Sequence, residues 1–399
     1  MIPPRLHTHD GRRTLVVAGL SVRTLAESAR QGGWRVISLD LFGDVDTRRA
    51  SAHWEAIGDV STLGIAPARL RKALDRAARC PDVDGWVAGS GFEGMPWLLD
   101  AGGPALPCLG MSAARVARLR SPTAFFGALD RLVLAHPPVS LEPPRDTVGW
   151  LAKQAGGCGG THIRRAADAV QDVRTPPADA YYQRVQNGVS MSALFVADGV
   201  EFRLVALNRL IACPLGDRPY VHVGAVGPVS DRALERTIGQ ALATLVPEFG
   251  LRGLASLDFI ADGATGVHLL EINPRPSASM QLHAQAWPAG LMRAHVEAVR
   301  GHLPALPPRH GDGVRGHSTV FAERASRIDA ASAEALAHAG HHHDLPAAGS
   351  CFACGDPVCT VSAQAAGIDQ VARLLHGRAV QVLARLSRIA EPALEESTT

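Results

Sequence analysis

Residues 254–276 read LASLDFIADGATGVHLLEINPRP and form the most informative stretch of the 399-residue chain. Apolar residues dominate both ends of this stretch, whereas residues 261–266 are mostly small and turn-forming. We therefore expect two strands, 254–260 and 267–272, that pair as a β-hairpin. Asp258 and Glu271 interrupt the apolar pattern at positions where a buried carboxylate needs a partner.

Three polar side chains of this hairpin are expected on one face. Glu271 and Asn273 are two positions apart and so point to the same side of a strand. A turn centred near residues 264 and 265 brings Asp258 alongside them. Two carboxylates and an amide oxygen suit Mg²⁺, with Mn²⁺ as an alternative, and Arg275 follows where it would contact an anion beside the metal. A structural salt bridge from one of the carboxylates to an arginine is the alternative explanation.

A second informative stretch, residues 153–161, reads KQAGGCGGT. Its glycines, Gly156, Gly157, Gly159 and Gly160, are too frequent for a stable helix or strand. A loop of this kind can fold its N–H groups around phosphate oxygens, while a flexible hairpin tip remains the alternative. Lys153, one of only two lysines beside 38 arginines, precedes the glycines and would reach a phosphate from the side. This order differs from that of a Walker A loop.

The order of predicted elements indicates two kinds of architecture. Strands alternate with helices in the first part of the chain, which predicts a doubly wound parallel sheet; the strands are 14–20, 34–42, 85–89 and 107–111, and the helices 23–31 and 66–80. A mostly antiparallel α+β region with a helix at 231–249 follows. We expect an α/β domain over 1–110, a core over 111–300 with a smaller lobe at about 145–190, and a C-terminal segment, 301–399, that completes the core.

Two further patterns support no separate function. Residues 89–94, GSGFEG, match the dinucleotide-binding fingerprint, but residues 101–129 lack the acidic residue that this function needs, so we interpret them as a tight turn. Cys351, Cys354 and Cys359 contain one C-x-x-C pair without a second, and we expect buried thiols rather than zinc. A metal or redox module built on these cysteines is kept as an alternative.

The composition excludes several classes of protein, beginning with those that bind nucleic acid through a strong positive charge. A formal net charge of +2 gives no electrostatic footprint for nucleic acid. Neither a secretory signal nor an apolar run long enough for a membrane span is present. Four of the seven cysteines are scattered in apolar surroundings, which suits reduced thiols, so we expect a cytoplasmic protein without membrane contact.

Lys153 before a glycine-rich loop, Asp258, and residues 270–276 (LEINPRP) together resemble the ATP-grasp superfamily of carboxylate–amine ligases. The resemblance implies a doubly wound N-terminal (pre-ATP-grasp) α/β domain, followed by an α+β core with two lobes. It also implies that Lys153 contacts ATP phosphates and that the loop 156–160 closes over them.

The remaining implied roles concern adenine, metal and phosphoryl transfer. Gln183 and Val185 match the segment that holds adenine between the lobes. Asp258, Glu271 and Asn273 match the Mg²⁺ ligands, and Arg275 the residue that steadies the transferred phosphoryl group. Two departures stand out: Ser190 and Ser192 lie where many members carry an acidic residue, and residues 118–122 carry arginine where many have a second ATP-binding lysine.

The resemblance implies an enzyme that joins a small-molecule carboxylate to an amine through an acyl phosphate. A narrower resemblance, carried by residues 89–93, 344–346 and 355–361, is to tyramine–glutamate ligase of methanofuran synthesis and its relatives in methylotrophic bacteria. It implies addition of an amino acid such as glutamate in methanofuran- or tetrahydromethanopterin-type cofactor biosynthesis. An ATP-binding switch without ligase activity is the alternative, and a homodimer is left open.

Overall fold

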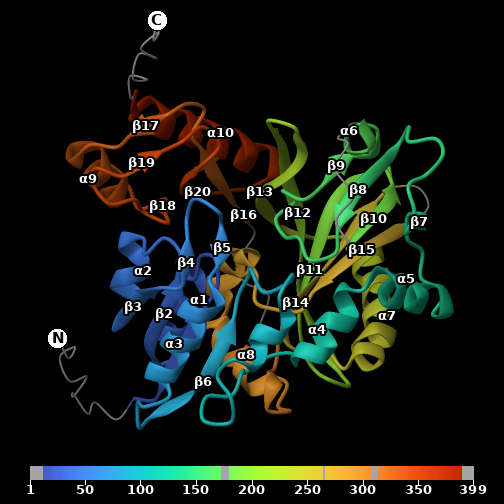
Figure 1. Cartoon of the computed structure of the whole chain (residues 1–399), viewed down its shortest axis with the longest axis horizontal. Helices are drawn as coiled ribbons and strands as arrows, with labels where there is room; N and C mark the ends of the chain where they lie inside the picture. The colour runs from blue at the N-terminus through green and yellow to red at the C-terminus, as the bar shows by residue number, and fades with distance from the viewer. Residues whose placement is uncertain (1–11, 172–178, 264–265, 308–312, 389–399) are drawn as a thin grey trace, which may run out of the picture.

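The computed structural model describes residues 12–171, 179–263, 266–307 and 313–388 (Figure 1). The chain begins with a parallel four-stranded sheet of order β3-β2-β1-β6. Its strands are β1 (Thr14–Ala18), β2 (Arg35–Asp40), β3 (His53–Ala56) and β6 (Val83–Ala88), connected through α1 (Arg23–Gln31), α2 (Val45–Ala50), the small hairpin β4 (Gly58–Asp59) and β5 (Gly64–Ile65), and α3 (Pro67–Ala77).

Both faces of this first sheet are covered, because alternate residues of β1 pack into different clusters. Val16 packs in a cluster with Leu70 of α3, whereas Leu15 packs in a second cluster with Leu25 of α1. The doubly wound prediction is therefore confirmed. The predicted fourth strand at 107–111 is wrong, because this segment forms only a single bridge, between Cys108 and Trp86.

A small antiparallel sheet of order β7-β10-β8-β9 lies apart from the first. Its strands are β7 (Val139–Ser140), β8 (Trp150–Gln154), β9 (Arg164–Arg165) and β10 (Ala180–Arg184). The chain reaches it through the 3-10 helix η1 (Pro96–Asp100), α4 (Ala113–Arg120) and α5 (Pro122–Arg131), and α6 (Ala166–Gln171) lies within it. The glycine-rich loop therefore connects two neighbouring strands of this sheet, β8 and β9.

An antiparallel eight-stranded sheet forms the centre of the molecule, with order β15-β14-β11-β12-β13-β16-β20-β18. The strands are β11 (Val189–Asp198), β12 (Phe202–Leu215), β13 (Arg218–Val229), β14 (Arg252–Ala261), β15 (Val267–Asn273), β16 (Val314–Phe321), β18 (His342–His343) and β20 (Pro357–Ala365). On one face Leu257 packs in the same cluster as Leu242 of α7 (Arg232–Phe249). On the other, Leu254 packs with Met292 of α8 (Leu291–Val299). Asp258 shares the face of Leu254.

The remaining elements complete the C-terminal part, which has its own apolar cluster. They are η2 (Ala278–Ala286), α9 (Ala330–His338), α10 (Ile368–Ala384) and the three-stranded sheet of β19 (Cys351–Phe352), β17 (Ser326–Arg327) and β21 (Ser387–Arg388). In the described ranges no helix is both long and apolar enough to cross a membrane.

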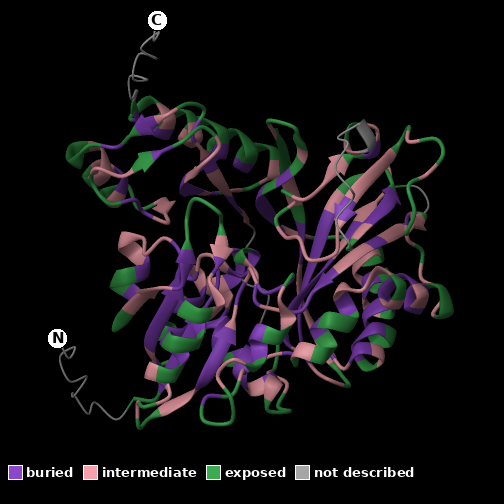
Figure 2. Cartoon of the chain, in the orientation of Figure 1, coloured by how far each residue is buried: buried purple, intermediate pink, exposed green. Residues whose placement is uncertain are grey.

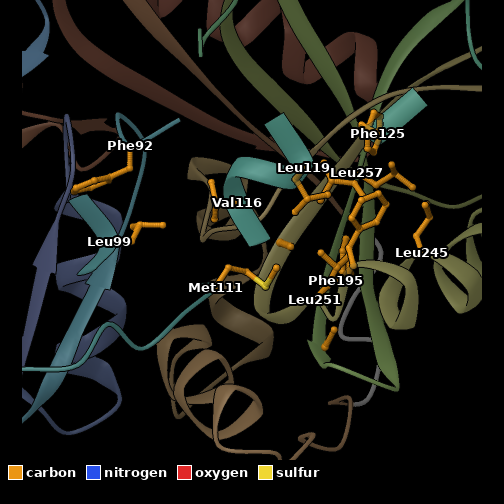
Figure 3. Packing of buried hydrophobic residues seen from close by; sticks show 14 of the residues in the cluster. Phe92, Leu99, Met111, Val116, Leu119, Phe125, Phe195, Leu245, Leu251 and Leu257 are labelled. Carbon is orange, nitrogen blue, oxygen red and sulfur yellow. The ribbon is translucent and has the colours of Figure 1, made fainter. Parts of the chain in front are cut away.

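The N-terminal unit and the central sheet share one apolar cluster (Figure 3). Phe92 and Leu99 continue through Met111 and Val116 to Leu257 of β14. Figure 2 shows where the buried residues lie: the strands of both sheets are largely buried, and the outer faces of the helices are exposed. Continuous packing of this kind holds the two parts in a fixed relation, because it removes apolar area of both from water.

A buried ion cluster joins the C-terminal part to α1. The guanidinium of Arg23, whose side chain is 3% exposed, donates through Nε to Asp344 Oδ1 at 2.8 Å. Its two other nitrogens donate to Glu27 at 2.8 Å and to Gln281 of η2 at 2.7 Å. Each nitrogen of the guanidinium thus has an oxygen acceptor, as a buried charge requires.

Candidate active site

The β14–β15 hairpin brings the three expected metal ligands together. Asp258 lies opposite Glu271, and Ser256 lies opposite Asn273. The Asn273 amide nitrogen donates to Asp258 Oδ2 at 3.0 Å and to Glu271 Oε1 at 3.3 Å. The expected turn centre, residues 264 and 265, lies outside the described residues.

The two carboxylates differ in their affinity for protons. Burial, followed by the charge of Glu271, raises the pKa of Asp258 to about 7, although the Ser192 hydroxyl donates to it at 2.7 Å. Burial also opposes ionisation of Glu271, but the charges of Arg120 and Lys153 prevail and lower its pKa. A half-buried pair of this kind is stabilised by a bound cation.

Lys153 and Gln183 lie on adjacent strands of the small sheet. Lys153 is opposite Tyr181, so Gln183 is its diagonal neighbour on the same face. The Lys153 ammonium donates to Gln183 Oε1 at 2.9 Å, and both side chains are buried. Because Oε1 accepts from the lysine, the amide presents Nε2 as a donor, and this buried nitrogen has no partner within the described residues. Val185, just beyond β10, is exposed.

The glycine-rich loop packs against Asp179 and against strand β13. The N–H of Gly156 donates to Asp179 at 3.0 Å, and the carbonyl of Gly159 accepts from the His222 N–H of β13 at 2.9 Å. A Cβ on Gly160 would lie 1.9 Å from the Tyr220 carbonyl oxygen. The glycines are therefore needed for close approach as well as for backbone freedom.

Arg120, at the C-terminal end of α4, connects this loop to the hairpin. Its Nε donates to the Ala155 carbonyl at 2.9 Å, and a second nitrogen donates to the carbonyl of Gly157. The third lies 3.2 Å from Glu271 Oε2. The salt bridge that the sequence offered as an alternative to a metal site is thus present beside it. Arg120 lies in the stretch where the resemblance implied a second lysine.

Arg275 forms a salt bridge that the sequence did not predict. Its Nε lies 2.7 Å from Glu93 Oε1, and the Glu93 side chain is only 5% exposed. Burial opposes ionisation of Glu93, but Arg275 and then Arg120 prevail and lower its pKa. One of the terminal nitrogens of Arg275 donates to Asn273 Oδ1 at 3.4 Å. The one sequence feature that could have indicated this partner was Glu93, the acidic residue inside the turn GSGFEG.

Three uncharged groups also line the site, and no sequence pattern indicated them. Burial lowers the pKa of His162 and that of His222 to about 4, so both imidazoles are neutral at pH 7. Burial raises the pKa of the Cys158 thiol to about 11, which argues against a thiolate nucleophile in the loop.

The C-terminal cysteines do not gather into a comparable site. The prediction of buried thiols is correct for Cys359 in β20 but wrong for Cys351 and Cys354, which are exposed. Within the parts of the chain that are described, no three His, Cys, Asp or Glu side chains lie close enough to hold a metal ion.

The site fits a nucleotide and a divalent cation in the chemistry of its donors. Asp258, Glu271 and Asn273 offer oxygen ligands of the kind Mg²⁺ prefers, although the Asn273 oxygen faces Arg275, so coordination requires rotation of its amide. Cations from three separate segments act on this pair: Lys153 on both carboxylates, Arg120 on Glu271, which it meets at 3.2 Å, and Arg275 on Asp258. The unpartnered Gln183 nitrogen provides a donor for a base.

Comparisons with known proteins show which fold this chain has. Residues 124–279 match the model of an ATP-grasp domain, a range that contains all the site residues predicted from the sequence. The chain has the ATP-grasp fold, preceded by an α/β unit. No curated protein matches its sequence.

Several solved structures share this fold over nearly the whole chain. A biotin carboxylase of Campylobacter jejuni, in complex with β-γ-ATP, is 14% identical with a TM-score of 0.69 and covers 94% of this chain and 91% of its own. The biotin carboxylase domain dimer of the Hydrogenobacter thermophilus 2-oxoglutarate carboxylase, with MgADP, ADP and bicarbonate, is 11% identical with a TM-score of 0.70 and covers 94% and 90%. An N5-carboxyaminoimidazole synthase of Aspergillus clavatus, with ADP and 5-aminoimidazole ribonucleotide, is 13% identical with a TM-score of 0.67 and covers 94% and 99%. At such low identity these likenesses concern the fold.

Proposed function

We propose that this protein is an ATP- and Mg²⁺-dependent ligase that activates a carboxylate as an acyl phosphate and transfers the acyl group to an amine. The observation that carries the proposal is the convergence of Arg120, Lys153 and Arg275 on the Asp258–Glu271 pair. Phosphoryl transfer requires compensation of charge on phosphate oxygens more than covalent chemistry from the protein. Mg²⁺ would add to that compensation by binding phosphate oxygens.

The positions of individual residues support the following proposed roles. Lys153 would contact a phosphate while Gln183 fixes the lysine and donates to the base. The N–H groups of the glycine loop, which Arg120 holds through two carbonyls, would surround the terminal phosphate. Arg275 would neutralise the transferred phosphoryl group. The acid then attacks the γ-phosphorus, ADP leaves, and the amine attacks the acyl carbon with loss of phosphate.

We further propose, from the resemblance of residues 89–93, 344–346 and 355–361, that the acid and amine belong to methanofuran- or tetrahydromethanopterin-type cofactor synthesis, with glutamate as one of them. The test is ADP release with a panel of acids and amines, with mass detection of the product. Glutamate is tried first, and bicarbonate is included because a structure of the same fold contains it. ADP release that does not depend on any acid or amine would instead favour an ATP-binding switch.

Two variants test the site itself. Lys153→Ala and Glu271→Gln are expected to abolish ADP release while circular dichroism shows an intact fold. Near wild-type ADP release from Glu271→Gln would refute the metal assignment. A dimer of a biotin carboxylase domain has been solved, and we propose a homodimer here as well, which the mass of the protein in solution tests.

A further inference from the structure

The turn at residues 89–94 has no chemical role in the reaction proposed above, yet its Glu93 side chain contacts Arg275 in the site. It follows β6, at the carboxyl edge of the first sheet, where ligands of open α/β sheets bind. Gly91 has a φ of +107°, and a Cβ at this position would lie 2.8 Å from Leu20. The turn is therefore tightly constrained, and its Gly91 N–H donates to Glu93 Oε2 at 2.7 Å.

Both carboxylate oxygens of Glu93 are committed to a partner. Oε2 accepts from Gly91, and Oε1 accepts from Arg275 Nε at 2.7 Å, across 182 positions of sequence. Glu93 is ionised and buried, and a buried charge is stable only when a partner compensates it. Arg275 supplies it, and the carboxylate in turn fixes the inner edge of the guanidinium.

The contact with Nε determines which nitrogens of Arg275 face the metal-binding residues. With Nε held by Glu93, one terminal nitrogen donates to Asn273 Oδ1 at 3.4 Å and the other to the Pro276 carbonyl at 3.5 Å, so both contacts are long. The guanidinium is planar, so fixing one edge fixes the direction of the other. The outer edge of Arg275 is thus oriented toward the hairpin while its hydrogen-bonding capacity there is only weakly used.

The same turn touches the opposite wall of the site. A Cβ on Gly156 of the glycine-rich loop would lie 2.7 Å from the Cα of Gly94. The N-terminal turn therefore lies in contact with the loop on one side and with Arg275 on the other, between the two groups expected to hold the transferred phosphoryl group.

We propose that Glu93 is a positioning residue for phosphoryl transfer, which acts by orienting Arg275 toward the phosphoryl group. This inference rests on the proposed ligase function. Loss of the Glu93 charge releases Nε, and the outer edge of Arg275 loses its fixed direction. Nucleotide binding through Lys153 and the glycine loop is left intact.

The experiment measures two affinities by calorimetry, those for MgADP and for MgADP with aluminium fluoride, which mimics the transferred phosphoryl group. Glu93→Gln is expected to bind MgADP like wild type and the aluminium fluoride complex about 100-fold more weakly, the loss typical of one misplaced charge-stabilising donor. The ligase kcat is expected to fall by a similar factor with KM for ATP unchanged.

The control is Asp84→Asn at the opposite end of β6. Asp84 is also largely buried, with a side chain 9% exposed and salt bridges to Arg13 and Arg300. Its loss is expected to lower the melting temperature without changing either affinity. A Glu93→Gln protein whose two affinities match those of Asp84→Asn would overturn the inference.

A double variant keeps the test decisive if Glu93→Gln does not fold. Glu93→Gln/Arg275→Met removes both charges together and avoids an uncompensated buried ion. Equal aluminium fluoride affinities for this protein and Arg275→Met support action through Arg275, whereas a further loss in the double variant contradicts it. A wild-type protein that binds no MgADP would refute the proposed function itself, a result distinct from either of these.

Discussion

The two adjacent glycines Gly159 and Gly160 allow a matched test of loop docking. Both have positive φ, +66° and +74°, so alanine at either position adds about 1–2 kcal/mol of backbone strain. They differ in surroundings. A Cβ on Gly159 would meet no atom within 4 Å, whereas a Cβ on Gly160 would lie 1.9 Å from the Tyr220 carbonyl oxygen.

Gly160→Ala must therefore move the loop away from β13, in addition to the strain that both variants share. Withdrawal breaks the hydrogen bond between Gly159 O and His222 N–H, which contributes about 1 kcal/mol. Displacement of the phosphate-binding N–H groups adds to this. We expect Gly159→Ala to weaken MgATP binding by about tenfold at most, and Gly160→Ala by at least about a further fivefold to tenfold.

The assay is KM for ATP in ADP release, together with MgADP affinity by calorimetry. Thermal unfolding of both variants checks that neither has lost the fold, and Gly160→Ala should melt slightly lower than Gly159→Ala because it also loses the bond between Gly159 O and His222 N–H. Equal nucleotide affinities for the two variants would refute the reasoning, since backbone strain alone would then explain both.

Three further outcomes follow from the site and its surroundings. Gln183→Leu removes the acceptor of Lys153 and the donor for a base, and we expect about tenfold weaker ATP binding in a fluorescent-nucleotide titration. Arg120→Lys keeps a charge near Glu271 but cannot hold two loop carbonyls as well, so KM for ATP should rise several-fold while unfolding by urea is little changed. Burial lowers the pKa of His295 from 6.5 to about 4, so the folded protein binds fewer protons than the unfolded chain between these values. Stability is fully present above pH 6.5 and falls by up to about 3 kcal/mol as pH drops through 4, and urea unfolding at pH 7 and 5 should show a smaller loss with pH in His295→Gln.

The sequence predicted those parts of the site that are close together in the chain. The β14–β15 hairpin follows from alternating apolar residues and turn chemistry within 23 positions, so the relation of Asp258, Glu271 and Asn273 could be inferred before the structure. Lys153 was indicated by its place before a run of glycines. Local patterns of this kind depend on strand geometry, which is the same in every protein.

The long-range partners could not be predicted in the same way. Arg120 meets Glu271 across 151 positions, and Glu93 meets Arg275 across 182. These contacts depend on how the first sheet packs against the central sheet, and no periodicity in one segment specifies that packing. The same holds for β13, whose glycines and prolines weaken its strand pattern although it pairs with two long neighbours.

The cluster around Arg23 has a consequence for the order of events during synthesis. Arg23 and Asp344 are separated by 321 positions. At a translation rate of about 5–20 residues per second, Asp344 is incorporated about 16 to 64 s after Arg23. Until then, the guanidinium of Arg23 on α1 lacks its Asp344 partner, at a surface that the C-terminal part buries in the folded protein. The nascent N-terminal unit can form its own sheet, but its final closure waits for the last quarter of the chain to emerge.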